Sequence, residues 1–484
     1  MSSPTWTAPS RAAVVGRSAR RTWPPKPLEI AAGILFVTFA AIALWTMRDG
    51  VHDWDEGVFW ETLRALSQGE PLFRSVYTAN PPVFYALMLP FWLAGHSILA
   101  LRLGILFYAL LGLAAAYAAG RLAAGHRAGL FAALLLAGSP LYLHQASIVQ
   151  VEAPAIALAL AAVVLALATG RTQPRAEPWL AAAAGIALTL AIGTKLSGAL
   201  AAVPVAIALL AVSGRRWLRV AACAAGAVVG LGIVALMVSG SWSQAFSELV
   251  THHTAAGILL DRPIGANLKQ VVLTRELPLD ALAIAGAVVA LLRRDVRSLA
   301  LVAWAAVTAV AILFYQPLWP HHLALLAPCL ALVAATGLGP LASDLRTRVG
   351  AGIVVAVFGS ALIGMAFAAR DVEHAPSTSA YDRTVAGALV SATRPGEKVI
   401  TDDLFIAALA GRDVPPSLTD TSADRIHSGL LTTAQIASIA DRDRIHTVLI
   451  DSGRLSQLPG FLDWLQGHFR MARSFGGGRA IYTR

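Results

Sequence analysis

The stretch IAAGILFVTFAAIALWTM, residues 30–47, decides the class of this protein. It contains no charged residue, and at about 1.5 Å per residue a helix of this length just spans a bilayer core of about 30 Å. Basic residues precede it, as in a signal peptide, but the apolar run is too long and no small-residue cleavage pattern follows. We therefore interpret it as an uncleaved first membrane helix.

Ten further apolar runs follow this first one. Hydrophobic residues make up 57% of the 484 residues and charged residues only 14%, with a mean hydropathy of +0.65, which is typical of an integral membrane protein. The sequence predicts an all-α polytopic domain of about eleven helices, with the ten further ones at about 98–120, 128–147, 151–169, 179–195, 197–213, 217–239, 278–292, 298–315, 322–342 and 350–369.

One apolar segment, 81–95, is shorter and interrupted by Pro90, which favours a juxtamembrane or interfacial helix. If it does not cross, the arginine clusters between helices all fall on the side of the basic N-terminus, as the positive-inside rule requires. The predicted organisation is a cytoplasmic tail (1–27), a membrane domain (28–369) with outer loops 48–97 and 241–277, and an extracytoplasmic domain (370–484).

The last 115 residues differ in character from the rest. They hold 13 Lys/Arg and 13 Asp/Glu, so the first 369 residues, with 25 basic and 15 acidic residues, carry the whole net charge of +10. Short β-rich runs at 398–401, 446–450 and 480–483 alternate with helical stretches at 405–411 and 458–468, which predicts a small α/β domain. Its acidic pairs, Asp402/Asp403 and Asp441/Asp443, are interpreted as solvated turns and caps.

Several function classes are excluded. Cys223 and Cys329 both lie in apolar runs, so a disulfide framework, a cysteine zinc site and an iron–sulfur cluster are not expected. The arginine clusters report membrane orientation and not nucleic-acid binding. A Gly-rich phosphate loop is absent from the sequence, which argues against an ATP-driven pump.

The first outer loop is crowded with carboxylates: Asp49, Asp53, Asp55, Glu56, Glu61 and Glu70 fall within 22 residues. Carboxylates close to hydrocarbon raise one another's pKa, which poises one of them to accept a proton or bind a cation. A solvated polar loop is the alternative. Trp54, Phe59 and Trp60 favour the first interpretation, because they indicate an amphipathic helix in the membrane interface.

The order of motifs in this loop resembles a known family. Trp54-Asp55-Glu56-Gly57, then Arg64 to Arg74 with its Gly69-Glu70-Pro71-Leu72-Phe73 core, then Asn80-Pro81-Pro82-Val83-Phe84-Tyr85, are similar to the first outer loop of polytopic GT-C glycosyltransferases. The likeness is to the dolichyl-phosphate-mannose-protein mannosyltransferase-like group, which includes the aminoarabinose transferases. It covers most of residues 30–345 and continues through Leu101-Arg102-Leu103, Ser139-Pro140, Glu152-Ala153-Pro154, Gly193-Thr194-Lys195 and His321-His322 with Pro328.

The resemblance implies inverting transfer of a sugar from a polyprenyl-phosphate donor to a hydroxyl-bearing acceptor on a protein, glycolipid or cell-wall glycan, at the outer face of a bacterial plasma membrane. This chemistry needs a base for the acceptor hydroxyl and cations for the departing phosphate. Asp55 matches the family's catalytic acidic position. Glu56 is expected to orient the acceptor or substitute for Asp55, or else to cap the following helix, and Asp53 is a weaker candidate.

Substrate-binding candidates lie at the outer helix ends. Glu152 is an ionisable group in an apolar stretch, which is by default a functional hypothesis. Lys195 is one of four lysines beside 34 arginines and suits a phosphate, although it could equally snorkel to the interface. Arg102 and the pair His321/His322 could complete a cationic pocket, although the sequence favours satisfied or interfacial side chains for the two histidines.

Three points stay open. Asn80 stands where the aminoarabinose branch places a lysine, so the resemblance does not extend to that sugar and acceptor. The loop 241–277 is either a lid or a connecting amphipathic segment. No tightly bound metal is expected, although His52, Asp53, Asp55, His252 and His253 can be written as a ligand set, and a divalent cation bridging carboxylate and phosphate is compatible with the sequence.

Two other classes compete with the enzyme. A transporter or flippase of lipid-linked precursors would share the apolar bulk and a phosphate-binding cation. Transporters commonly place ionisable groups and broken helices near the bilayer midplane at a repeat interface. Here the charges gather at outer helix ends and no internal repeat is found. A non-catalytic scaffold is disfavoured by the Asp55-Glu56 pair.

Overall fold

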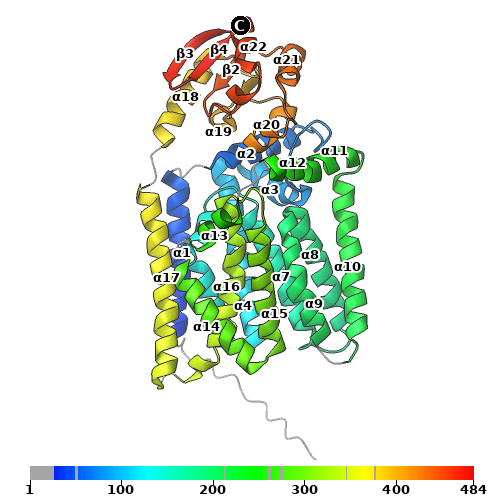
Figure 1. Cartoon of the computed structure of the whole chain (residues 1–484), viewed down its shortest axis with the longest axis vertical. Coiled ribbons are helices and arrows are strands. Elements are labelled where there is room, and N and C mark those ends of the chain that lie inside the picture. The colour runs from blue at the N-terminus through cyan, green and yellow to red at the C-terminus, as the bar shows by residue number, and fades with distance from the viewer. Residues whose placement is uncertain are drawn as a thin grey trace, which may run out of the picture.

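The computed structural model describes residues 27–49, 53–211, 214–259, 263–272, 276–344, 346–374 and 378–484. The basic tail before residue 27 and His52 lie outside these ranges. Figure 1 shows a bundle of long helices below, a layer of short helices above it, and an α/β unit (378–484) at the top. This arrangement matches the predicted fold class.

Eight helical segments among the described residues are long and apolar enough to cross a membrane: Glu29–Met47, Ile98–Ala124, Glu152–Thr169, Glu177–Thr194, Arg216–Met237, Val296–Leu313, Pro320–Leu338 and Arg348–Asp371. They belong to α1 (Pro27–Asp49), α4 (Ile98–Ala124), α7 (Glu152–Thr169), α8 (Glu177–Thr194), α10 (Arg216–Met237), α15 (Val296–Leu313), η3 (Pro320–Leu325) with α16 (Leu326–Leu338), and α17 (Arg348–His374).

The other three predicted spans are helical but shorter or broken. The run 128–147 divides into α5 (His126–Ala137) and α6 (Pro140–Gln145), because Pro140 cannot continue the preceding helix. The run 197–213 begins as the 3₁₀ turn η1 (Leu196–Ala201) before α9 (Ala202–Ala211). The run 278–292 forms α14 (Leu277–Arg293). The segment predicted not to cross is α3 (Pro82–Gly95), a helix of only 14 residues.

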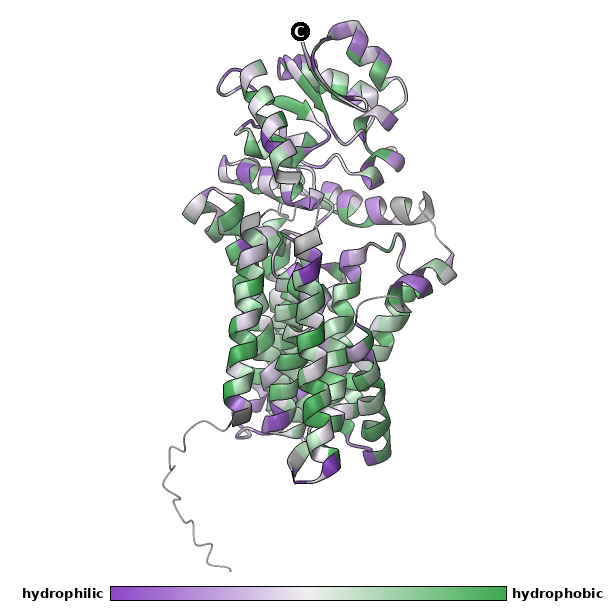
Figure 2. Ribbon diagram, turned by 90° about the vertical axis from the view of Figure 1, so that its left-hand side faces the viewer, coloured by the Kyte–Doolittle hydropathy of each residue, from purple (hydrophilic) through white to green (hydrophobic). Residues whose placement is uncertain are grey.

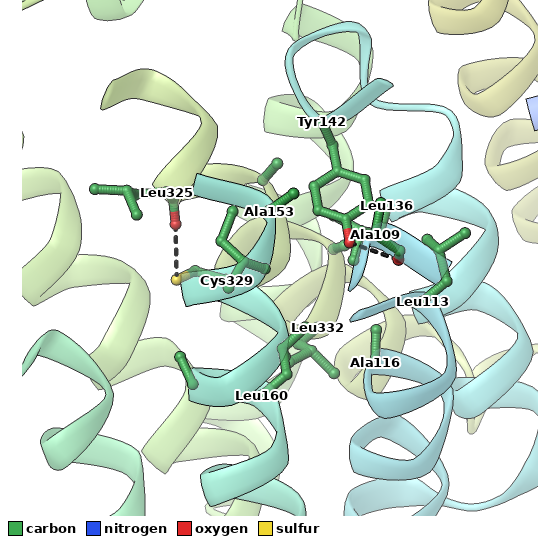
Figure 3. Close-up of a cluster of buried hydrophobic side chains, with 14 of the residues drawn as sticks. Ala109, Leu113, Ala116, Leu136, Tyr142, Ala153, Leu160, Leu325, Cys329 and Leu332 are labelled. Atoms are coloured by element: carbon green, nitrogen blue, oxygen red, sulfur yellow. Dashed lines mark hydrogen bonds between the residues drawn. The ribbon is translucent and has the colours of Figure 1, made fainter. Parts of the chain in front are cut away.

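Small residues let the bundle helices approach closely. A Cβ added at Gly226 of α10 would lie 1.9 Å from the carbonyl oxygen of Ala182 in α8, so only glycine fits there. The buried centre is a mixture of alanine and leucine, with one aromatic side chain satisfied internally (Figure 3): the hydroxyl of Tyr142 donates to the carbonyl of Ala109 at 2.8 Å.

The outer surface of the bundle is apolar. Figure 2 shows hydrophobic residues dominating the long helices and hydrophilic residues gathering at their ends and in the upper unit. On α10, for example, Val228 is 69% exposed and Leu236 75% exposed. Such a surface suits hydrocarbon and not water, so the chain is a multi-span membrane protein.

Between the bundle and the upper unit lies a layer of short helices, which includes α2 and α3 (Figure 1). Its members are α2 (Trp54–Ser67), α3, α11 (Trp242–Phe246), the π-helical turn η2 (Ser247–Thr251) and α12 (His252–Leu259), whereas α13 (Ile264–Val272) lies lower, against α15. The loop 241–277 thus contains helices that lie beneath α20 (Ala423–His427), and α12 contacts α20 directly.

The upper unit is built on a four-stranded sheet of order β1-β2-β4-β3, in which β1 and β2 are parallel and the other neighbours antiparallel. Three strands were predicted. The fourth, β3, was not, because its seven residues include two arginines and show no apolar alternation, and its side chains are mostly exposed. The strands are β1 (Val399–Thr401), β2 (Thr447–Ile450), β3 (Arg470–Gly476) and β4 (Arg479–Thr483).

Helices and turns surround this sheet. They are α18 (Thr378–Ala392), α19 (Leu404–Leu409), η5 (Pro416–Leu418), α20, α21 (Thr433–Arg442), η6 (Leu455–Gln457) and α22 (Phe461–His468), and a further turn, η4 (Leu341–Ser343), precedes α17. Asp403 caps α19, as predicted. The prediction of a solvated Asp402 is wrong, because this residue is fully buried. Its carboxylate can be buried because it accepts the backbone N–H groups of Asp451, Ser452 and Leu455.

The upper unit is docked on α2. The indole N–H of Trp54 donates to the carbonyl of Asp402 at 3.0 Å, and Arg64 pairs with Asp413 at 3.0 Å. A Cβ at Gly57 would lie 2.2 Å from the backbone nitrogen of Phe405, so the two backbones touch. The α2 helix, which carries Asp55 in its first turn, is therefore held between the bundle and the upper unit.

Candidate active site

A cavity of about 760 Å³ lies where the bundle, the short helices and the upper unit meet. One side, which we call the bundle wall, includes Gln150, Lys195, His321 and His322. The lining residues that belong to the upper unit form what we call the C-terminal wall, and they are Asp420, Ser422, Ala423, Asp424 and Arg454. Asp53 and Asp55 line the cavity at the start of α2.

The two aspartates are fixed by the N-terminus of α2. Asp53 is the N-cap, and its Oδ1 accepts the backbone N–H of Asp55 at 2.9 Å. The amide of Gln150 donates to Asp55 Oδ2 at 2.7 Å and to Asp53 Oδ1 at 3.2 Å. Burial, reinforced by the negative charge of Asp53, raises the pKa of Asp55 to about 6, which suits a group that takes up a proton near neutral pH.

Glu56 faces away from this cavity. Its carboxylate is fully buried, with Oε2 at 2.6 Å from Nη2 and Oε1 at 2.8 Å from Nε of Arg102, and it also accepts the N–H of Val149 at 2.9 Å. With Asp53 it forms a capping box at the start of α2. The capping alternative for Glu56 is therefore observed, and Arg102 is engaged by Glu56 and the carbonyl of Met47 and does not line the cavity.

Lys195 stands on the bundle wall, where α8 ends and the chain becomes extended before η1. Its ammonium group pairs with Glu152 Oε1, at the first position of α7, and His321 Nε2 lies 3.9 Å from the same oxygen. Gly193 permits this placement, because a Cβ there would lie 2.6 Å from Val83. Sequence reasoning thus selected three side chains that the fold brings together.

Glu152, His321 and His322 also form the one group among the described residues whose ligand atoms lie close enough to hold a metal ion, within 4.8 Å of one another. The fit is incomplete. Lys195 already pairs with Glu152, and Nδ1 of His322 accepts the backbone N–H of Trp319 at 3.3 Å. A divalent cation would have to displace the ammonium group. This group differs from the ligand set written from the sequence.

The segment predicted as a lid or connector contributes to the cavity. His252, His253 and Thr254 of α12 line it. Nδ1 of His252 is hydrogen-bonded to the hydroxyl of Tyr77 at 2.8 Å, and His253 Nε2 lies 3.0 Å from the carbonyl of Ala79. Burial lowers the pKa of His252 to about 4, so this histidine is neutral at physiological pH.

The aromatic residues of the first outer loop do not face lipid. Trp60 is 7% exposed and packs at 5.5 Å, edge to face, against Trp92, while Phe59 packs at 4.7 Å against Phe84. The prediction of a helix was right and that of an interfacial face was wrong, because the upper unit and α3 cover it. Trp319 lines the cavity as well.

Sequence reasoning missed the entire C-terminal wall. The charged residues of this wall, Asp420, Asp424 and Arg454, belong to a region in which every few residues are charged. Being charged therefore does not distinguish them as site residues. Gln150 was missed as well. Its position two residues before Glu152, in an otherwise apolar stretch, was the signal that could have found it.

Fold and site together define a class: a multi-span membrane protein of the GT-C fold with a polar cavity at one end of its bundle. Residues 79–242 match the family model described as dolichyl-phosphate-mannose-protein mannosyltransferase. The match covers Glu152 and Lys195 and begins after Asp55. A search of curated proteins finds no match.

Solved structures confirm the resemblance at the level of the fold. ArnT from Cupriavidus metallidurans bound to undecaprenyl phosphate is 15% identical, with a TM-score of 0.68 over 94% of this chain and 97% of that one. The apo state of the same protein gives a TM-score of 0.64 at 15% identity over 93% and 98%. AglB from Archaeoglobus fulgidus, in complex with an inhibitory peptide and a dolichol-phosphate, gives 0.53 at 13% identity over 90% and 72%.

Proposed function

We propose that this protein is a membrane glycosyltransferase that moves a sugar from a polyprenyl-phosphate donor to the hydroxyl of an extracytoplasmic acceptor by an inverting displacement. The observation that carries the proposal is the convergence of Asp55, with its raised pKa, and Lys195 in one cavity at the end of an apolar bundle. Structural neighbours with bound undecaprenyl phosphate or dolichol-phosphate support the choice of donor.

In this mechanism Asp55 is the general base. The acceptor oxygen attacks the anomeric carbon, its proton passes to the Asp55 carboxylate, and the bond from the anomeric carbon to the phosphate oxygen breaks with its electrons on that oxygen. Gln150 donates to Asp55 and so orients it. One displacement inverts the anomeric configuration. Asp53 stays engaged as the N-cap, which leaves a single carboxylate for the reaction.

Lys195 is proposed to hold the departing phosphate. An ammonium group in a poorly hydrated wall stabilises the negative charge that develops on the phosphate oxygen. Glu152 keeps this group in place before the donor arrives, and His321 lies close enough to share the phosphate. Arg102 is left out of this pocket because Glu56 engages it.

The orientation follows from charge. Arginine clusters between helices lie at the end of the bundle opposite the upper unit, and the positive-inside rule assigns that end to the cytoplasm. We propose a bacterial plasma membrane protein with its N-terminus inside, its membrane domain at 28–369 and its domain 370–484 outside. The cavity then opens at the outer face, where lipid-linked donors and envelope acceptors meet.

The test supplies purified protein in liposomes with radiolabelled polyprenyl-phosphate sugars and measures free polyprenyl phosphate. We expect one donor to be cleaved, slowly by water and faster with an acceptor. Asp55→Asn lowers cleavage by about 10²- to 10⁴-fold, the usual contribution of a positioned base. Asp463→Asn, an exposed carboxylate in the first turn of α22, is the matched control and retains wild-type cleavage.

Two outcomes would contradict the proposal. Cleavage by Asp55→Asn at the wild-type rate would show that Asp55 is not the general base. If a donor binds and crosses the liposome equally well with both proteins but is never cleaved, the protein is a flippase of lipid-linked precursors.

A further inference from the structure

We infer that the C-terminal unit forms the acceptor subsite, in which Arg454 and Asp424 bind the hydroxyl groups of a carbohydrate acceptor. This inference rests on the proposed function and goes beyond it by naming the class of acceptor and the residues that select it.

Arg454 is placed beside the proposed base by the sheet and by an aromatic contact. It follows the carboxyl end of β2, after a turn anchored by the buried carboxylate of Asp402. Its guanidinium carbon lies 3.8 Å from the ring centroid of Trp54, the residue directly before Asp55. Arg454 and Asp55 both line the cavity, and the negative charge of Asp55 opposes the lowering of the Arg454 pKa by burial.

Asp424 occupies the first turn of α20, which packs on α12. It lies on the same wall of the cavity as Arg454, with Trp319 and His253 also lining the space. Burial raises the pKa of Asp424 and lowers that of Arg454. Both groups are therefore partly withdrawn from water at a surface that faces a cavity.

Each of these side chains retains unused hydrogen-bonding capacity. Nη1 of Arg454 and Oδ1 of Asp424 are buried and have no hydrogen-bond partner within the described parts of the chain. Buried polar groups are normally paired, and a pair of unsatisfied groups in a cavity wall is what a bound polar ligand would complete. One is a donor and the other an acceptor.

The position of the C-terminal wall indicates that it binds the acceptor and not the donor. The polyprenyl chain of the donor must stay with the apolar bundle, so its phosphate lies on the bundle wall beside Lys195. In an inverting displacement the attacking hydroxyl approaches from the side opposite the leaving phosphate. We assign that side to the C-terminal wall, because its residues belong to the upper unit, which covers this end of the bundle. Asp55 interacts with both groups of residues: His321 of the bundle wall lowers its pKa and Asp420 of the C-terminal wall raises it.

The chemistry of the wall favours a carbohydrate. A sugar hydroxyl both donates and accepts, so neighbouring hydroxyls match a carboxylate beside a guanidinium, and Trp319 offers a large apolar surface to a sugar ring. A peptide acceptor is commonly fixed by main-chain hydrogen bonds to a strand edge. Among the described residues, neither edge strand of the sheet, β1 or β3, lines the cavity.

The experiment uses the full-length protein in liposomes with the donor identified above. Two acceptor pools are compared: fluorescent oligosaccharides from bacterial envelopes, and fluorescent peptides rich in serine and threonine. Hydrolysis by water is measured in parallel. Arg454→Gln and Asp424→Asn are compared with Arg470→Gln and Asp463→Asn, exposed residues of the same unit. Arg454→Lys is the conservative variant that keeps the positive charge. Melting temperatures report on the folding of every variant.

We expect transfer to oligosaccharides. Arg454→Gln and Asp424→Asn each lower the ratio of transfer to hydrolysis at least tenfold by raising the KM for the acceptor, Arg454→Lys recovers part of it, and the two controls keep the wild-type ratio. Transfer to peptides, no transfer to any oligosaccharide, or an unchanged ratio in the variants would overturn the inference. Absence of any donor cleavage by the wild type would instead defeat the proposed function itself.

Discussion

The two walls of the cavity are built from different kinds of sequence. The bundle wall takes its charge from Lys195, a rare ionisable residue in a long apolar stretch, which is supported by Glu152. The C-terminal wall takes its charges from a segment in which every few residues are charged. A charge inside hydrocarbon-facing sequence is costly and therefore informative, whereas a charge in a water-exposed unit is not.

The largest effect on folding is expected at the ion pair behind the bundle wall. Glu56→Gln leaves the guanidinium of Arg102 buried without its counter-charge, which costs about 3–5 kcal/mol. The melting temperature in detergent should fall sharply, and activity should fall with it. Glu70→Gln is the control, since that residue is partly exposed. An unchanged melting temperature with lost activity would make Glu56 a reacting group.

The next effect concerns the bundle wall itself. Lys195→Met removes the proposed phosphate contact and also the ammonium group that pairs with the buried carboxylate of Glu152. The loss of about 2 kcal/mol of donor binding should raise the KM for the donor at least about thirtyfold. Lys269→Met, at an exposed position of α13, should have no effect. A normal donor KM would assign Lys195 to the interface alone.

A third prediction addresses the junction between bundle and upper unit. Gly57→Ala places a Cβ against the backbone of Phe405, so the two elements must move apart at a cost of roughly 1–3 kcal/mol. Melting temperature and transfer should both fall. Gly33→Ala in α1 meets nothing within 4 Å and should be neutral. Equal behaviour of the two variants would mean that the junction is not needed.

The smallest change is in pH dependence. Because the base must be ionised and burial raises the pKa of Asp55 to about 6, cleavage should fall about tenfold per pH unit below 6 and be constant above it. Asp53→Asn removes a negative neighbour that raises this pKa, so the midpoint should move to lower pH. A rate that falls as pH rises through 6 would indicate a general acid.

The sequence predicted the helical bundle, most of the sheet and, in the bundle wall, Lys195 and the two histidines but not Gln150, because apolar length and isolated charges are governed by the membrane. It did not predict the contacts between side chains that are far apart in the sequence and meet only when the elements pack together. Trp60 was assigned to the interface because its partner Trp92 could not be known. Arg102 was assigned to phosphate because only the fold shows Glu56 beside it.

The C-terminal wall could not be predicted for the same reason. Arg454 becomes part of the site only when the unit docks on α2 and the guanidinium stacks over Trp54. These residues are 400 positions apart. A local pattern contains no information on such a contact, whereas Asp55 and Lys195 could be singled out from their immediate surroundings.

The most direct test of the account is a structure of the protein in lipid nanodiscs with a non-cleavable polyprenyl-phosphonate sugar. The account predicts the phosphonate against Lys195 on the bundle wall, with the anomeric carbon close to Asp55 and its free face toward Arg454. Reacting atoms in a productive complex lie about 3–3.5 Å apart, which sets the expected room for an acceptor oxygen. A phosphonate bound away from Lys195, or a sugar pointing away from Asp55, would contradict it.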